Sequence, residues 1–281
     1  MSNGDEIVEL FGLPATRGQR WQAVVEGQHC PYLDRKCIKV RKSEPDVSIG
    51  TCTVHYGKAP IVICPFRLLE RRQVFADCIH LLTLHEPGNE FHIVTEVSIP
   101  GGSIDYFLVS VHRGRAIDFV GIELQTLDTT GTVWPARERF LQFVGVPHDR
   151  EAAASGKPFG MNWKMTAKTI LVQLHHKVET FAHLSKHLVL VVQDRLLDYM
   201  RREFSFDHLA REPRVGDPMH FHSYSLQRDH QGLRLEMAQR LSTDVAGIAT
   251  ALGLQAEAKV EIESILADIQ RKLSNRTRWT P

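Results

Sequence analysis

The sequence predicts an α/β fold built on a mixed β-sheet flanked by helices, and three observations lead to this prediction. Three strand-like runs follow one another closely at residues 91–99, 103–112 and 116–127. A continuous apolar, β-branched run at 187–194 has the composition of a buried parallel strand. Segments with helical spacing stand before the first three runs and between the third and the fourth. From residue 66 the order is therefore α-β-β-β-α-β, which places helices on the faces of a mixed sheet.

The first 65 residues differ in composition from the rest of the chain. Residues 1–24 read as a short leader with helical character, and residues 25–60 are rich in Cys, Pro, Gly and charge. Because residues 25–60 show no sustained apolar period, they cannot easily pack a core unaided. We therefore expect an N-terminal segment at 1–65 that needs an additional tie, and a second unit at 66–281.

The elements of the second unit follow from local patterns. Residues 66–84 carry apolar side chains near helical spacing and predict an amphipathic helix. Gly101-Gly102 and Arg113-Gly114-Arg115 separate the strand-like runs and predict turns. Seven Gly and Pro residues within 128–162 predict a long loop. Beyond it the pattern predicts a helix at 163–184, the strand at 187–194, a helix at 194–204, a strand at 219–227 and a helical C-terminus at 241–273 with a break near Gly253.

Composition indicates a globular protein of the cytoplasm. The chain has 281 residues, of which 43% are hydrophobic and 24% are charged. No apolar run approaches the roughly 18 residues that a membrane helix needs, and the N-terminus lacks the pattern of a signal peptide. The sequence has neither a Gly-rich phosphate loop nor a G-x-S-x-G motif. The net charge is only +1, but residues 17–42 hold seven Lys or Arg against two acids. This basic segment is either a nucleic-acid contact or an ordinary solvated surface.

Acidic residues interrupt the three consecutive strands. Asp105 and Glu123 each stand within an apolar strand, and Glu96 lies on the first strand. A carboxylate inside an apolar sheet is costly to bury unless it is paired or binds a metal ion. Glu123 and Gln125 are two residues apart and point to the same face, so Asp105 can converge with them on a hard-oxygen site suited to Mg²⁺. The alternative is that the acids face solvent or pair with Arg113 or Arg115.

The cysteines suggest a second metal site. Cys30, Cys37, Cys52 and Cys64 fall within 35 residues, and the fifth, Cys78, lies outside this cluster. An odd number of cysteines in a chain without a signal peptide argues against a disulfide framework. Tetrahedral coordination by four thiolates fits zinc or iron, and it would tie a segment that lacks its own core. The alternative is four small buried side chains, because no pair has the tight C-x2-C spacing.

The same residues resemble a known family. The stretches TEVSIPGGSIDYFLV and DFVGIELQTLDTTGT, together with IGTC and ICPFRLLE upstream, resemble the PD-(D/E)XK nucleases and, more closely, the NotI-like restriction endonucleases. The likeness spans about residues 25–200. The general nuclease motif is short, whereas four upstream cysteines combined with E-x8-D and E-x-Q are more specific. The resemblance implies a PD-(D/E)XK core with an N-terminal four-cysteine segment.

The resemblance also implies roles for the site residues. Asp105 and Glu123 would bind Mg²⁺, and Glu96 would be an additional acid. Gln125 would occupy the position where most of the superfamily has lysine, and it can orient a water molecule but cannot act as a base. The resemblance favours iron over zinc at Cys30, Cys37, Cys52 and Cys64.

The implied function is site-specific cleavage of double-stranded DNA by a homodimeric type II restriction endonuclease. The alternatives are a metal-tied DNA-binding protein with an inactive nuclease core, and a repair nuclease of low sequence specificity. The loop that follows the third strand would emerge beside the scissile phosphate and contact DNA, or be an ordinary charged loop. Its candidate residues are Trp134, Arg137, Arg139, Arg150 and Lys157.

Overall fold

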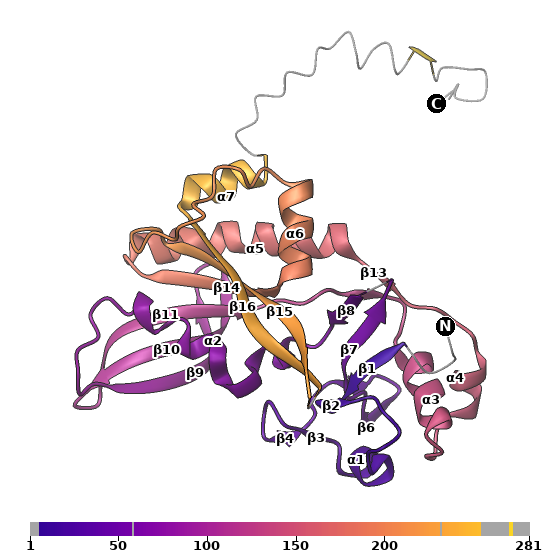
Figure 1. Ribbon diagram of the computed structural model, residues 1–281. Helices are drawn as coiled ribbons and strands as arrows, with labels where there is room; N and C mark the ends of the chain where they lie inside the picture. Colours follow the sequence, from indigo (N-terminus) through magenta and orange to yellow (C-terminus); the bar gives the residue numbers. More distant parts are fainter. Residues whose placement is uncertain (1–5, 58, 231, 254–269, 272–281) are drawn as a thin grey trace, which may run out of the picture.

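A six-stranded mixed sheet forms the centre of the molecule (Figure 1). The computed structural model describes residues 6–57, 59–230, 232–253 and 270–271. In spatial order the strands are β16 (Gly232–Thr243), β15 (Met219–Asp229), β14 (His187–Gln193), β11 (Arg115–Leu124), β10 (Gly102–His112) and β9 (Glu90–Ile99). β14 pairs in parallel with β11 and β15, and the remaining pairs are antiparallel.

Helices pack on both faces of this sheet. On one face lie α5 (Trp163–His183), α6 (Asp194–Glu203) and α7 (Val245–Ala251), and the short η1 (Pro65–Arg72), α2 (Gln73–Ala76) and η2 (Ile79–Leu81) belong to the other (Figure 1). The two faces have separate apolar clusters, one containing Leu171 and Phe181 of α5 and the other containing Leu68 and Phe75. Alternation along each strand divides its side chains between the two clusters.

The strands differ in burial according to their place in the sheet. Every residue of β14 is buried, because this strand has a neighbour on each side and helices above and below. Its continuous apolar composition is the pattern of a parallel strand covered on both faces. β9 is an edge strand, and nine of its ten residues are exposed.

Two glycines allow α5 to lie close to the sheet. A Cβ atom on Gly121 of β11 would be 2.3 Å from Cζ of Phe181 in α5. Gly101, in the turn between β9 and β10, has φ +94° and would place a Cβ 2.8 Å from the backbone oxygen of His176. Both positions therefore require a residue without a side chain.

The first 65 residues form a smaller sheet with two short ladders. The four-stranded sheet has the order β2 (Leu13–Pro14), β1 (Ile7–Leu10), β7 (Thr51–Tyr56) and β8 (Ala59–Val62). The ladders pair β3 (His29–Cys30) with β4 (Arg35–Lys36) and β5 (Val40–Arg41) with β6 (Glu44–Ser48). The helix α1 (Trp21–Gly27) precedes them.

Side-chain contacts tie this smaller sheet to the rest of the molecule. The side-chain amide of Gln193, at the end of β14, accepts from the backbone nitrogen of Val62 at 2.9 Å and donates to the oxygen of Pro60 at 2.9 Å. Buried Arg67 of η1 pairs with Glu9 of β1 at 2.8 Å and with Glu70 at 2.9 Å. The two sheets are therefore joined by paired polar side chains and by an apolar cluster that includes residues of both sheets.

The predicted mixed α/β sheet is confirmed, and three local predictions differ from the structure. Within the predicted leader, residues 6–20 contain β1 and β2, and a helix begins only at Trp21. Residues 66–84 form short helical turns because Arg71 and Arg72 adopt left-handed backbone angles and break the helix. The expected loop at 128–162 contains α3 (Trp134–Phe143), α4 (Arg150–Ala154) and the short strands β12 (Thr129–Thr130) and β13 (Gly160–Met161).

The C-terminal prediction differs as well. The stretch 232–243 is strand β16, which pairs with β15 along its length. The helix α7 covers only Val245–Ala251. Residues 254–269 and 272–281 of the expected helical C-terminus lie outside the described residues.

Candidate active site and neighbouring cleft

Two of the predicted carboxylates meet on the face of the sheet that α5 covers. Asp105 of β10 and Glu123 of β11 lie on adjacent strands, whose register pairs Tyr106 with Ile122. The backbone N–H of Leu124 donates to Asp105 Oδ2 at 2.9 Å, which holds the Asp105 side chain against β11. Glu123 is 4% exposed and Asp105 is partly buried. The expectation that these two acids converge agrees with this arrangement.

Glu96 lies next to Asp105 but is exposed. In the β9–β10 ladder the pairs Val97–Ile104 and Thr95–Tyr106 flank it, so Glu96 stands opposite Asp105. Its φ of +54° is unusual for a residue other than glycine and interrupts the regular strand. The charge of Glu96 still raises the pKa of Asp105, which places the two carboxylates within electrostatic range.

Lys177 is a site residue that the sequence analysis did not identify. It lies on α5, and its Nζ donates to Glu123 Oε1 at 2.6 Å. The residue stands on the apolar stripe of the helix, which includes Leu174, Val178 and Phe181. A lysine on a buried stripe is a signal that the sequence does contain, because lysine is almost never fully buried unless it is paired.

Burial controls the protonation of both carboxylates. Desolvation raises the pKa of Glu123 to about 7; the hydrogen bond from Lys177 opposes this shift, whereas the charge of Asp105 adds to it. The pKa of Asp105 is also raised, first by desolvation, against the opposing hydrogen bond from the Leu124 N–H. Both groups would be ionised more readily in the presence of added positive charge.

Gln125 follows Glu123 on the same face and borders a small recess. Its backbone N–H donates to the oxygen of Val191 at 3.0 Å, which continues the pairing of β11 with β14. The recess is lined by Glu123, Gln125, Gln173, Lys177 and three apolar residues. Gln125 therefore places a neutral amide beside the buried ion pair.

In this structure the acidic side chains are not arranged as a metal-binding group. Within the described parts of the chain, no set of three or more His, Cys, Asp or Glu side chains is arranged to hold a metal ion. Glu123 is turned toward Lys177, and one oxygen of Asp105 is used by a backbone N–H. The donor set nonetheless fits Mg²⁺, because it consists of carboxylate oxygens whose mutual repulsion a cation would relieve.

The four predicted cysteines cluster in the smaller half of the molecule. All four are buried and free. Cys52 and Cys64 share a side-chain hydrogen bond, which lowers the pKa of Cys64 to about 6 and raises that of Cys52 well above its usual value. Desolvation raises the pKa of Cys30 and of Cys37, and the charge of Cys64 adds to this shift, so both lie within electrostatic range of Cys64.

The backbone around these cysteines is closely hydrogen-bonded. The N–H of Leu33 donates to the oxygen of Cys30 at 3.3 Å, and the N–H of Arg67 donates to the oxygen of Cys64 at 3.0 Å. The thiol of Cys52 donates to the oxygen of Gly50 at 3.4 Å. Nearby backbone N–H groups lower the pKa of Cys64, whereas desolvation keeps the pKa of Cys30 and Cys37 raised. Within the described residues the four sulfurs do not form a metal-binding group.

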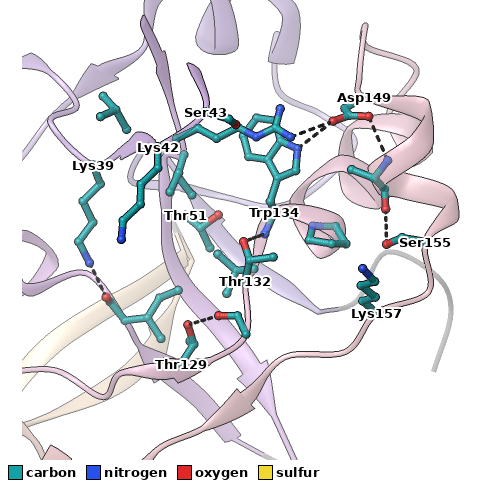
Figure 2. A pocket seen from close by; sticks show the side chains of 18 of the residues that line it. Lys39, Lys42, Ser43, Thr51, Thr129, Thr132, Trp134, Asp149, Ser155 and Lys157 are labelled. Atoms are coloured by element: carbon teal, nitrogen blue, oxygen red, sulfur yellow. Dashed lines mark hydrogen bonds and ion pairs between the residues drawn. The ribbon is translucent and has the colours of Figure 1, made fainter. Parts of the chain in front are cut away.

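A cleft of about 1080 Å³ lies between the cysteine-bearing segment and the part of the chain that follows β11. Residues next to three of the four cysteines line it, namely Ile38, Thr51 and Ile63. On the other side lie Leu127–Thr129, α3 and α4. Figure 2 shows Lys42 and Lys157 on opposite sides of this cleft. The cleft thus begins four residues beyond Glu123 along the chain.

The arginines of the predicted DNA-contacting loop have different roles. Arg137 is 2% exposed, donates to the oxygen of Ile49 at 2.8 Å and lies 4.5 Å from the ring centre of Trp134. Arg139 pairs with Glu6 at 2.6 Å. These two side chains hold α3 against the N-terminal region, so for them neither the predicted DNA contact nor the alternative of an ordinary charged loop applies. Arg150 and Lys157 are exposed.

A second buried polar cluster lies on the opposite face of the sheet. His220 and His222 on β15 are 1% and 0% exposed, and the buried Nδ1 of His220 and Nε2 of His222 have no hydrogen-bond partner. Desolvation lowers the pKa of His220 to about 4 and that of His222 to about 3. Both histidines are therefore neutral at physiological pH.

Comparison with known proteins now defines the class of this protein. A buried and a partly buried carboxylate lie on adjacent interior strands beside a buried lysine, and the matching family is one of restriction endonucleases. The family model described as Restriction endonuclease NotI matches residues 26–237, which include every predicted site residue and Lys177. The chain belongs to the NotI restriction endonuclease family and is a type II restriction endonuclease. No curated protein matches the sequence. Among the described helices, none has the length and apolarity to cross a membrane.

Proposed function

We propose that the protein cleaves double-stranded DNA at a specific sequence by a Mg²⁺-dependent reaction in a PD-(D/E)XK core. The observation that carries this proposal is the pair Asp105 and Glu123, on adjacent strands and on one face of the sheet, with a buried cation against them. These two residues would bind Mg²⁺, and exposed Glu96 stands beside them as the additional acid. Membership of the NotI family supports DNA as the substrate.

Each side chain of the proposed site would have a different role in hydrolysis. A bound Mg²⁺ would lower the pKa of a coordinated water molecule and neutralise charge on the phosphate. Asp105 and Glu123 fix the position of the ion relative to the sheet. The neutral amide of Gln125 accepts a hydrogen bond from the attacking water and orients it toward phosphorus. The water molecule would lose one proton to solvent as its oxygen bonds to phosphorus, the bond to the leaving deoxyribose oxygen would break, and that oxygen would take up a proton from a second water molecule.

We further propose that Cys30, Cys37, Cys52 and Cys64 bind one structural iron or zinc ion. Support comes from the burial of the four cysteines and from their electrostatic coupling. Four thiolates would leave no open position for substrate, so this ion would have a structural role. It would fix the wall of the cleft that carries Lys39, Arg41 and Lys42.

The cleft would receive part of the DNA near the cut. Asp128 lies five residues beyond Glu123 along the chain, a span of at most roughly 18 Å. At about 3.4 Å per base pair this places the cleft within about five base pairs of the scissile phosphate. Lys42 and Lys157 are exposed cations that line the cleft and would contact phosphates or base edges, and exposed Arg150 lies next to the lining residues Asp149 and Glu151 in the chain.

The remaining features of the proposal concern assembly and location. A homodimer would place two active sites on a palindromic DNA site, one for each strand. The division of the chain at residues 65 and 66 separates the cysteine-bearing segment from the nuclease unit. A cytoplasmic location suits an enzyme with free cysteines that acts on DNA.

The experiment that tests this function is digestion of a plasmid of known sequence with and without Mg²⁺. We expect discrete fragments with Mg²⁺ only, and mapping their ends gives the recognition sequence. A smear of fragments would instead indicate a repair nuclease of low specificity. Binding of DNA without cleavage would indicate an inactive nuclease core.

A further inference from the structure

Lys177 is a cation held inside the proposed metal site by a helix. Its Nζ is 2.6 Å from Glu123 Oε1, and the side chains of Lys177 and Glu123 are 9% and 5% exposed. The charge of Lys177 also acts on Asp105. Lysine is among the residues least often buried, and here it is buried beside the two acids that the proposed function requires.

The turn between β9 and β10 fixes the position of Lys177. A Cβ atom on Gly102 would be 3.3 Å from Cε of Lys177, and one on Gly101 would be 2.8 Å from the backbone oxygen of His176. Thr180 Oγ1 of α5 donates to the oxygen of Pro100 in the same turn at 3.0 Å. The strand that bears Glu96 and the strand that bears Asp105 are thus held directly against the helix turn that bears Lys177.

The balance of charge in this site is negative. Asp105, Glu123 and the neighbouring Glu96 carry three acidic groups against the single ammonium of Lys177. Gln125, which lies directly after β11, adds no charge. A DNA phosphate would bring further negative charge, and its transition state would need cationic donors in fixed positions.

We propose that Lys177 is a catalytic residue of this enzyme, which pairs with Glu123 in the free protein and donates a hydrogen bond to the scissile phosphate when a divalent cation is bound. This inference rests on the proposed function and extends it to a residue on α5. The ion would take over the neutralisation of Glu123, and repulsion between the two cations would turn the ammonium away from Oε1. The four-carbon stem of lysine allows this movement while the Cα atom stays fixed in the helix.

The first test measures single-turnover cleavage at saturating Mg²⁺. Lys177→Met keeps the length of the apolar stem and removes the charge, and we expect the rate constant to fall about a hundredfold, as for loss of one preorganised donor to a transition state. Lys177→Arg keeps a cation and should fall less. Lys168→Met, at an exposed position of the same helix, is the matched control and should cleave like the wild type. A Lys177→Met variant that cleaves at the wild-type rate would overturn the proposal, because a mere counter-ion is replaced by the metal.

The second test measures binding of Ca²⁺ without DNA, from the rise in melting temperature with Ca²⁺ concentration. We expect Lys177→Met to bind Ca²⁺ about tenfold more tightly than the wild type, because no ammonium competes for Glu123. Unchanged or weaker Ca²⁺ binding in a folded variant would contradict the competition between the two cations.

The third test moves the charge to the neighbouring strand. The double variant Gln125→Lys with Lys177→Met restores an ammonium to the same recess, and we expect it to recover at least part of the lost cleavage. No recovery, in a variant that binds Ca²⁺ and DNA normally, would count against a role of the charge itself. Failure of the wild type to cleave any DNA with Mg²⁺ would overturn the proposed function, whereas full cleavage by Lys177→Met overturns only the role of Lys177.

Discussion

The six-stranded sheet and the cysteine-bearing segment keep their polar groups in place in different ways. In the sheet, Asp105 and Glu123 are held by strands whose order comes from two large apolar clusters. Around the cysteines the strands are only two to six residues long, and the segment packs, through Trp21, Cys37 and Ile63, into the apolar cluster of α5. The difference teaches that long paired strands hold the acidic site, whereas the short strands beside the cleft depend on packing against the larger sheet and on the ion that we propose the four sulfurs bind.

Removal of either carboxylate, Asp105 or Glu123, should have the largest effect of all. It should lower the rate of cleavage and leave DNA binding intact. Asp105→Asn and Glu123→Ala are each expected to lower cleavage at least about a thousandfold, because each removes a ligand of the proposed metal ion. DNA binding in Ca²⁺ should remain measurable by fluorescence anisotropy, since the sheet is held by its apolar clusters. Glu203→Ala, at an exposed position of α6, is the control. Full cleavage by either variant would refute the site.

Loss of cysteines should act on binding more than on the sheet. The double variant Cys37→Ser with Cys64→Ser is expected to lose its bound metal and to bind DNA on the order of a hundredfold more weakly, because the basic wall of the cleft loses its tie. Elemental analysis and a DNA titration measure the two effects. Cys78→Ala lies on the other face of the sheet and should keep the metal. Wild-type protein that contains neither iron nor zinc would remove the proposed metal site.

Acid should destabilise the sheet through the buried histidines. His220 and His222 have pKa values lowered to about 4 and about 3, from 6.5, chiefly by desolvation. Because the unfolded chain binds protons more readily, the stability that these groups contribute is complete above pH 6.5 and is lost as the pH falls toward their folded pKa values. The loss at about pH 5 is about 2 kcal/mol for each histidine.

Urea unfolding followed over pH measures this slope. His222→Gln, at the more strongly shifted position, should flatten the curve, and His183→Gln, at an exposed position of α5, should leave it unchanged. Glu123, whose pKa is raised to about 7, opposes this slope, so the test is the difference between variant and wild type. A His222→Gln curve that parallels the wild type between about pH 7 and pH 5 would show that His222 remains hydrated in the folded protein.

Gln125 should have the smallest effect of the four. Gln125→Ala is expected to slow single-turnover cleavage about tenfold, or about 1.4 kcal/mol, because the amide orients water without binding the metal ion. Ca²⁺ binding should be unchanged. A loss as large as that of Glu123→Ala would mean that the amide is a metal ligand, and the division of roles would then need revision.

The sequence predicted the elements whose pattern is governed by one strong period. Strands β9, β10, β11 and β14 and helix α5 were expected within a few residues of their bounds, because apolar alternation or continuous apolarity determined them. Elements of mixed burial were missed: β16 alternates buried and exposed residues irregularly, and α3 buries Arg137 and Glu138 as a pair. Because charged residues are usually exposed, a sequence pattern predicts a surface position even for those that are buried as ion pairs.

The sequence also predicted only part of the candidate site. Asp105 and Glu123 were found because each carboxylate interrupts an apolar strand, and the strand order then brings them together. Lys177 was not found, because its partner Glu123 is 54 residues away and only the packing of α5 brings the two together. Pairing across such a distance is a property of the fold that local periodicity does not contain.

Gly121 shows how little room separates the helix from the chemistry. It lies two residues before Glu123, and the ring of Phe181, one helical turn beyond Lys177, occupies the space where its side chain would be. A methyl group at position 121 would push α5 away from the sheet. The ammonium of Lys177 would then lie farther from Glu123 on β11. The distance between Lys177 and Glu123 therefore depends on Gly121, which has only a hydrogen atom where other residues have a side chain and takes no part in the reaction.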